Sequence, residues 1–192
     1  MCLPQSPSVS TMESTRCLSK DLPPYLYRIQ HRTTQTRYSE SGGLEASDTT
    51  TLFGETSEKD AFKQAVENQF TWDFKHPTPF ISFFSDKTHA INWGFCLKKW
   101  GPRSRTDDDW SILTIDTSCL QNTYVFKLST VIDELDVKIP KTAEDAHKPG
   151  GYFCLHRVPA CAIVCKKVGS LPRFQLHCKP LFHFSSSETL TN

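Results

Sequence analysis

The order of the apolar segments is the feature that most constrains the fold of this chain. Short runs rich in aromatic and β-branched residues predict strands, and longer stretches with apolar residues at helical spacing predict helices. The predicted strands are residues 25–29, 80–85, 110–115, 124–128, 152–158 and 162–168. The predicted helices are residues 59–70, 86–99 and a short one over 130–135. Because strands and helices do not alternate regularly, this order favours an α+β fold over a doubly wound parallel sheet.

Composition along the chain predicts one domain between two tails. Residues 1–22 are rich in serine, threonine and proline and poor in large apolar side chains, so they predict a disordered tail. Residues 23–168 contain the predicted strands and helices and form the expected domain. Residues 169–192 are expected to be a partly disordered C-terminal extension. Within the domain, residues 140–151 are expected to form a loop.

The charge balance excludes partners that bind mainly through electrostatics. The chain carries 22 Lys plus Arg against 21 Asp plus Glu, a formal net charge of +1. A nucleic-acid-binding protein or a polybasic membrane protein is expected to show a larger positive excess. No apolar run approaches the roughly 20 residues of a spanning helix, and residues 1–20 lack the apolar core of a signal peptide. We therefore expect an intracellular, cytoplasmic protein without a membrane segment.

The eight cysteines follow no recognised ligand spacing. A zinc site can be drawn from Cys154, His156, Cys161 and Cys165, but strong zinc motifs pair two ligands two to four residues apart, twice. In a reducing compartment disulfides are not expected. The sequence therefore favours buried free thiols and predicts no metal site.

Two polar residues interrupt strands that are otherwise apolar. Arg28 lies within residues 25–29, and Ser82 lies within residues 80–84. An arginine on a mostly apolar strand needs either solvent or an anionic partner. Pattern alone favours the simpler interpretation, in which Arg28 is a surface residue of an edge strand and Ser82 bonds to the backbone.

At these two residues the chain resembles the ADP-ribosyltransferase fold of the cholera-toxin and heat-labile enterotoxin A subunits. Leu26-Tyr27-Arg28, Phe80-Ile81-Ser82 and Val158-Pro159 follow one another in the order of that family's motifs. The chain is also similar to uncharacterised fungal proteins with a toxin-like domain. The resemblance implies two small antiparallel or mixed sheets that form a cleft, with helices inserted between the strands.

The resemblance also implies how NAD would be held as a substrate. Arg28 would bind a phosphate through its planar guanidinium, and Ser82 would position the nucleotide. The family's catalytic glutamate lies eight residues before the proline of its Ile-Pro motif, and counting back from Pro159 reaches Gly151. Phe84 stands where the family has a second serine. The expected catalytic carboxylate is therefore missing.

Three hypotheses follow, and a structure can separate them. The first is a pseudoenzyme of the transferase fold that binds NAD through Arg28 and Ser82. The second is an active transferase that uses Glu144 or Asp145 in place of the missing glutamate. The third is a module that binds a protein partner and has filled its cleft. An open pocket between Arg28 and Ser82 favours the first, whereas a closed cleft with Arg28 in an ion pair favours the third.

Overall fold

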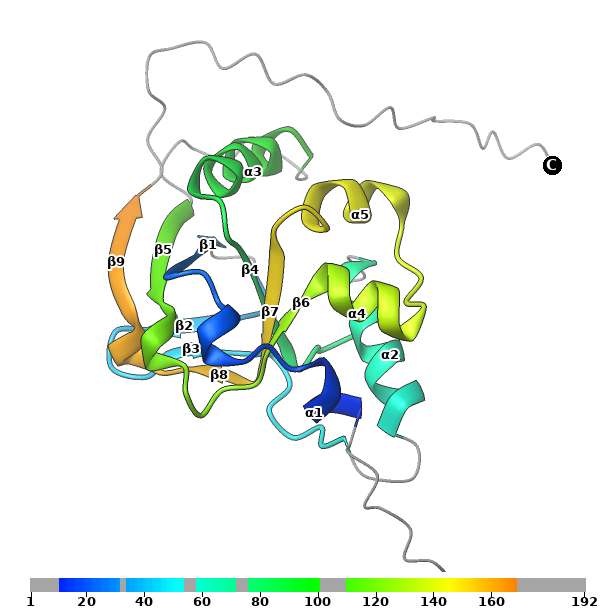
Figure 1. Cartoon of the computed structure of the whole chain (residues 1–192). Coiled ribbons are helices and arrows are strands. Elements are labelled where there is room, and N and C mark those ends of the chain that lie inside the picture. The colour runs from blue at the N-terminus through cyan, green and yellow to red at the C-terminus, as the bar shows by residue number, and fades with distance from the viewer. Residues whose placement is uncertain (1–10, 32–33, 54–57, 72–75, 101–109, 169–192) are drawn as a thin grey trace, which may run out of the picture.

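The computed structural model describes residues 11–31, 34–53, 58–71, 76–100 and 110–168 (Figure 1). It confirms the predicted α+β class: two antiparallel sheets are combined with five α-helices in the described part of the chain. The strands lie close to the apolar runs of the sequence, because those runs supply the β-branched and aromatic residues that a pleated, buried surface favours.

The larger sheet has six strands in the order β6-β7-β4-β1-β5-β9. In chain order these are β1 (Tyr25–His31), β4 (Phe80–Phe84), β5 (Trp110–Asp116), β6 (Val125–Lys127), β7 (Gly151–Leu155) and β9 (Ile163–Val168). All neighbouring pairs are antiparallel. Strand β1 lies between β4 and β5, so the strand that carries Arg28 is an interior strand and not the edge strand that the sequence pattern favoured.

The smaller sheet consists of β2 (Arg37–Ser39), β3 (Gly43–Glu45) and β8 (Arg157–Val158), in that order. The run over residues 152–158, predicted as one strand, is divided between the two sheets at His156, whose φ is 60°. Gly43 has a φ of 81°, and a Cβ there would lie 2.1 Å from the carbonyl oxygen of Val158. Only glycine lets β3 approach β8 this closely.

Helices cover the face of the larger sheet that points away from the smaller one. Helices α2 (Glu58–Phe70) and α4 (Leu128–Leu135) pack a phenylalanine-rich core against β4, β6 and β7. Helix α3 (Lys87–Trp100) packs against β1, β4 and β5. A third apolar cluster, which includes Leu26, Leu44 and Ile81, fills the space between the two sheets. The aromatic content of the sequence is therefore concentrated in the core between helices and sheet.

A fifth helix occupies the segment predicted to be a loop. Residues 140–151 contain α5 (Lys141–His147), which ends immediately before β7 begins at Gly151. Pro140 precedes the first helical residue, and its carbonyl oxygen accepts hydrogen bonds from the amides of Ala143 and Glu144 at 2.8 and 3.0 Å, which closes the first turn. Ala143 and Ala146 are buried on its inner side. The loop prediction was wrong because three charged residues and only two alanines leave little apolar periodicity to detect.

The predicted N-terminal tail is partly folded onto the domain. Residues 11–15 form the short helix α1 (Thr11–Thr15), and residues 19–21 form a 3₁₀ turn. The amide of Cys17 donates to the carbonyl oxygen of Val125 at 2.8 Å, which attaches the segment to the edge of β6. The prediction of disorder therefore does not hold for residues 11–22. Residues 1–10 and the predicted extension 169–192 lie outside the described residues.

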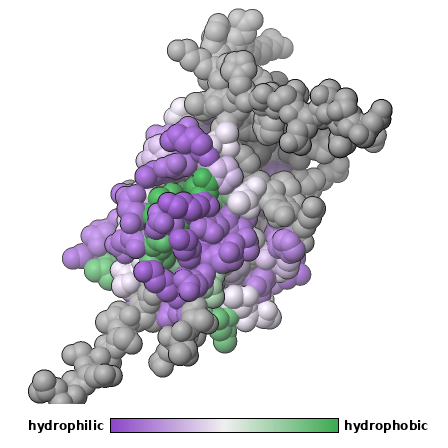
Figure 2. Space-filling view, turned by 90° about the vertical axis from the view of Figure 1, so that its right-hand side faces the viewer, coloured by the Kyte–Doolittle hydropathy of each residue, from purple (hydrophilic) through white to green (hydrophobic). Residues whose placement is uncertain are grey.

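The side of the molecule that carries α2, α4 and α5 is mainly hydrophilic, with an apolar area near its middle and smaller apolar spots towards its edges (Figure 2). Among the helices of the described residues, none combines the length and the apolar character that crossing a membrane requires.

Candidate functional site

The site forms where two central strands of the larger sheet diverge. Strands β1 and β5 are paired along their whole length, from Tyr25 with Asp116 to His31 with Trp110. Strands β1 and β4, in contrast, are paired at a single position, Tyr27 with Phe84. Beyond this pair the backbone groups of β4 that face β1 need other partners.

Arg28 supplies one of these partners. Its Nη1 donates to the backbone carbonyl oxygen of Ser82 at 2.8 Å, and its Nε donates to Oε1 of Gln30 at 3.1 Å. The amide nitrogen of Gln30 donates in turn to Oγ1 of Thr34 and to the carbonyl oxygen of Thr36, both at 2.8 Å. The guanidinium is therefore held in place between the strands by a chain of neutral groups.

No anion in the described residues neutralises Arg28. The side chain is 6% exposed, and none of the ion pairs in the described parts of the chain includes it. Cys154 is the ionisable group whose negative charge would favour the protonated form of Arg28. Burial raises the pKa of this thiol, however, so the thiol stays neutral. Burial also lowers the pKa of Arg28 to about 10, so the guanidinium stays protonated at neutral pH. An uncompensated buried cation is costly and attracts an anion.

Arg28 lines a pocket of about 150 Å³ that opens to solvent. A guanidinium has five N–H donors, and two of those in Arg28 have acceptors in the described protein. The polar part of the pocket wall also includes Ser82, Thr36 and Gln69. Among the described residues that line it, none is an aspartate or a glutamate. The pocket is thus a positively charged recess with donors available to an anion.

An aromatic wall closes the other side of this pocket. It contains Phe70, Phe80, Trp93 and His147. The imidazole of His147, which ends α5, stacks on Phe84 with ring centroids 5.0 Å apart and planes at 12°. Its edge contacts with Phe70 and Trp93 have centroid distances of 5.3 and 5.0 Å. Burial, followed by the neighbouring His89, lowers the pKa of His147 to about 3, so this wall is uncharged at neutral pH.

The backbone excludes a side chain at the position where the resemblance places a catalytic glutamate. A Cβ on Gly151 would lie 2.3 Å from the carbonyl oxygen of His147, closer than any real contact of this kind. Gly151 also lies directly opposite Phe84 in the β4–β7 pair. The two departures from the toxin motif are therefore neighbours, and the end of α5 occupies the space beside them.

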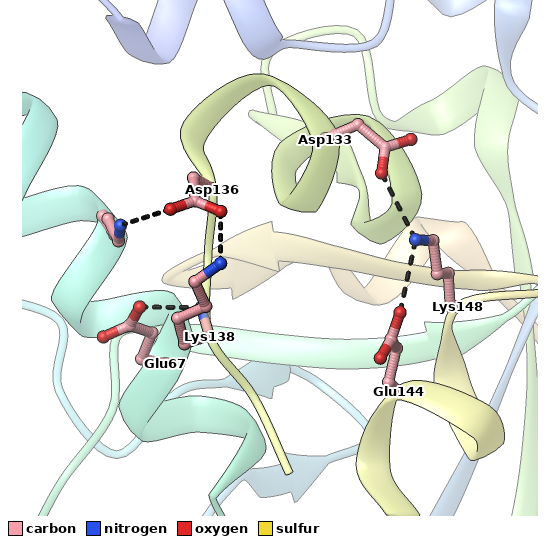
Figure 3. A network of polar contacts seen from close by, with 7 residues as sticks. Glu67, Asp133, Asp136, Lys138, Glu144 and Lys148 are labelled. Carbon is pink, nitrogen blue, oxygen red and sulfur yellow. Dashed lines mark hydrogen bonds and ion pairs between the residues drawn. The ribbon is translucent and has the colours of Figure 1, made fainter. Parts of the chain in front are cut away.

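The two substitute carboxylates proposed from the sequence lie on α5 and are paired with lysines. Glu144 lies within 3.3 Å of the ammonium of Lys148, which also contacts Asp133 of α4 (Figure 3). Asp145 lies 2.8 Å from the ammonium of Lys141. Neither carboxylate lines the Arg28 pocket. Both residues belong to a helix and not to the loop that the sequence predicted. Their side chains are held in ion pairs with lysines, away from the pocket.

No group of three or more histidine, cysteine or acidic side chains gathers at metal-binding distance within the ranges that the structure describes. The cysteines described are free thiols, with Cys154 buried and Cys161 exposed. The zinc site that can be drawn from the sequence therefore has no counterpart in the geometry of these residues.

Comparison with known protein families assigns most of the described structure to one family. Residues 21–171 match the family described as Domain of unknown function DUF7587. The chain belongs to this family. No curated protein matches it, and no solved structure does. The match begins in the 3₁₀ turn Ser19–Asp21 and includes every strand of the described residues, so the residues that line the Arg28 pocket lie within the matched range.

The sequence located part of the site in this DUF7587 domain. It identified Arg28 and Ser82, which the structure brings together, although through the Ser82 carbonyl oxygen. It missed Gln30, Gln69 and His147. Gln30 had a signal, because residues two apart on a strand share a face. The other two belong to helices whose position against the sheet depends on tertiary packing.

Proposed function

We propose that this protein binds an anionic, phosphate-bearing ligand at Arg28, with NAD in its oxidised or reduced form as the first candidate, and that it does not transfer ADP-ribose. The observation that carries the proposal is the buried Arg28 guanidinium, which has only neutral partners among the described residues and lines an open pocket. A planar guanidinium fits phosphate oxygens well and can bind two of them at once.

The hydrogen-bond donors of the pocket fit the phosphate-binding step that the toxin resemblance implies. A phosphate would be held by the N–H groups of Arg28 that remain available, while Ser82 and Thr36 line the space beside it. Pockets for small molecules and cofactors are usually about 300–1,000 Å³. The recess, with its volume of about 150 Å³, therefore takes one end of a dinucleotide, and the remainder would lie outside it.

The same residues do not fit the transfer of ADP-ribose, the second step that the resemblance implies. Cleavage of the bond between nicotinamide and ribose develops positive charge on the sugar, which a carboxylate stabilises. The described lining offers no carboxylate, and Gly151 has no room for one. Glu144 and Asp145 are held in ion pairs on the outer side of α5. This arrangement supports a pseudoenzyme of the transferase type and offers nothing in favour of an active enzyme.

The interaction-module hypothesis predicts a filled cleft with Arg28 in an ion pair. Phe84 and His147 do fill part of the region, as that hypothesis expects. Arg28, however, has no ion pair within the described residues, and the pocket beside it is open. These two features favour ligand binding over a purely structural role for the arginine.

Two measurements on the full chain test this proposal. Isothermal titration calorimetry with inorganic pyrophosphate and with NAD is expected to show saturable binding at one site. Incubation with radiolabelled NAD and a cell extract is expected to leave the label untransferred and the nicotinamide bond intact. Absence of binding to both titrants rejects the ligand site, and release of nicotinamide rejects the pseudoenzyme assignment.

A further inference from the structure

We propose that the Arg28 pocket selects nucleotides whose end group is uncharged, such as ADP-ribose or reduced NADH, over NAD⁺ with its cationic ring. This inference rests on the proposed function, because it assumes that Arg28 holds a phosphate at the inner end of the ligand. The inference goes beyond the proposed function because it states which charge the group next to that phosphate carries.

The charge of the pocket wall is the main argument. Arg28 is the one arginine or lysine in the described lining, where it stays protonated at neutral pH, and no aspartate or glutamate accompanies it. An oxidised nicotinamide ring carries a positive charge within a few bonds of the phosphate. Because the Arg28 side chain is only 6% exposed, water screens its charge less than that of a surface arginine, and it repels a second positive charge more strongly than it would in bulk water.

The aromatic wall does not compensate for this repulsion with a negative charge. His147 is buried at the end of α5, where it is neutral and packs against Phe84, Phe70 and Trp93. A carboxylate facing the ring would normally balance a pyridinium, but Gly151 cannot carry one. The wall is apolar and suits a planar ring or the apolar face of a sugar.

Gln69 gives a second, independent constraint on the end group. Its Oε1 is buried and has no hydrogen-bond donor among the described residues, and Gln69 lines the same pocket as Arg28. A buried acceptor without a partner is costly, and a ligand that donates to it recovers that cost. Ribose hydroxyls and a carboxamide N–H are donors of this kind. The pocket therefore fits an anion joined to a group that donates a hydrogen bond.

The test compares three nucleotides and pyrophosphate on the same protein by isothermal titration calorimetry. NADH and NAD⁺ form a matched pair, because they differ in the charge and planarity of one ring. We expect ADP-ribose and NADH to bind at least about tenfold more tightly than NAD⁺. Equal affinities for NADH and NAD⁺, or tighter binding of NAD⁺, overturn the charge preference. If pyrophosphate still binds in that case, the anion site at Arg28 remains and only this inference fails.

A single substitution tests the cause of the preference. Gln69→Glu places a carboxylate in the pocket without changing the shape of the side chain, so it is expected to reverse the order and favour NAD⁺. Gln64→Glu is the matched control, since Gln64 lies on the exposed side of the same helix α2. The same change in preference in both variants contradicts a local effect. If circular dichroism shows that Gln69→Glu does not fold, the NADH and NAD⁺ comparison on the unmodified protein decides alone, and failure of every titrant to bind rejects both proposals.

Discussion

Phe84 and Gly151 face each other across the β4–β7 pair, and both lie against His147 at the end of α5. The ring of Phe84 stacks on the imidazole, and the missing side chain of Gly151 leaves room for the His147 carbonyl oxygen. The two positions at which the chain departs from the toxin motif are therefore parts of one packing arrangement around His147.

Gly151 is expected to tolerate no side chain. In Gly151→Ala the new Cβ would lie 2.3 Å from a backbone oxygen that cannot move without displacing α5. We expect the free energy of unfolding to fall by about 2–3 kcal/mol, as for other overpacked positions. Gly150→Ala is the control, because there the Cβ would meet the end of the flexible Ser85 side chain at 2.8 Å. Urea denaturation measures both, and equal losses would contradict the backbone clash.

His147 is expected to make the protein less stable in mild acid. Burial lowers the pKa of His147 from 6.5 to about 3, so below pH 6.5 the unfolded chain binds a proton that the native state does not. The contribution to stability is present above pH 6.5 and is lost progressively as the pH falls towards 3. Between pH 7 and pH 5 the loss is on the order of 2 kcal/mol.

The measurement is urea denaturation at several pH values for the unmodified protein and for His147→Phe. The variant keeps an aromatic ring against Phe84 and removes the titrating group, so it is expected to show a flatter pH profile. Substitution of the exposed His76 by glutamine should leave the profile unchanged. A profile that keeps its full slope in His147→Phe would show that another group causes the acid sensitivity.

Gln30 is expected to position Arg28 without contacting the ligand's phosphate itself. Gln30→Met keeps the length of the side chain but removes the acceptor for Nε of Arg28 and the donors to Thr34 and Thr36. We expect the affinity for pyrophosphate to fall several-fold, with a loss of stability of about 1 kcal/mol. Calorimetry with Gln64→Met as the exposed control tests this. An unchanged affinity would mean that Ser82 alone orients the guanidinium.

The carboxylates of α5 are expected to be dispensable for binding. Glu144→Gln and Asp145→Asn each remove exposed ion pairs with lysines, which contribute less than about 1 kcal/mol. We expect affinities for ADP-ribose within twofold of the unmodified protein, measured by calorimetry. A large loss of affinity in either variant would show that α5 turns a carboxylate towards the ligand and would revive the active-enzyme hypothesis.

The sequence predicts the strands of the larger sheet and the long helices, because their apolar runs are dense and are bounded by prolines and glycines. It does not predict β2 and β3 of the smaller sheet, which lie in a polar stretch. It predicts Arg28 and Ser82 as candidates because each interrupts such a run. It does not predict α5, whose buried residues are two alanines and a histidine, or the folding of residues 11–22 onto β6. The site depends on both kinds of information, since His147 reaches the pocket only through the packing of α5.

The burial of Arg28 is a second feature that the local sequence does not predict. On pattern alone an arginine in a short strand is most simply a surface residue, because local sequence does not reveal which strands are its neighbours. The pairing of β1 with β5 on one side and its divergence from β4 on the other place the guanidinium inside the sheet. That arrangement depends on pairing between residues more than fifty positions apart. The pattern of residues within a single strand cannot reveal such pairing.

The most direct test of the account is calorimetric titration of ADP-ribose into the unmodified protein, Arg28→Gln and Arg37→Gln. Arg37 is an exposed arginine paired with Glu45, so its substitution changes the net charge equally without touching the pocket. The account predicts saturable binding to the unmodified protein and to Arg37→Gln, and affinity at least about tenfold weaker in Arg28→Gln. Equal binding to all three proteins would contradict the assignment of Arg28 as the anion site.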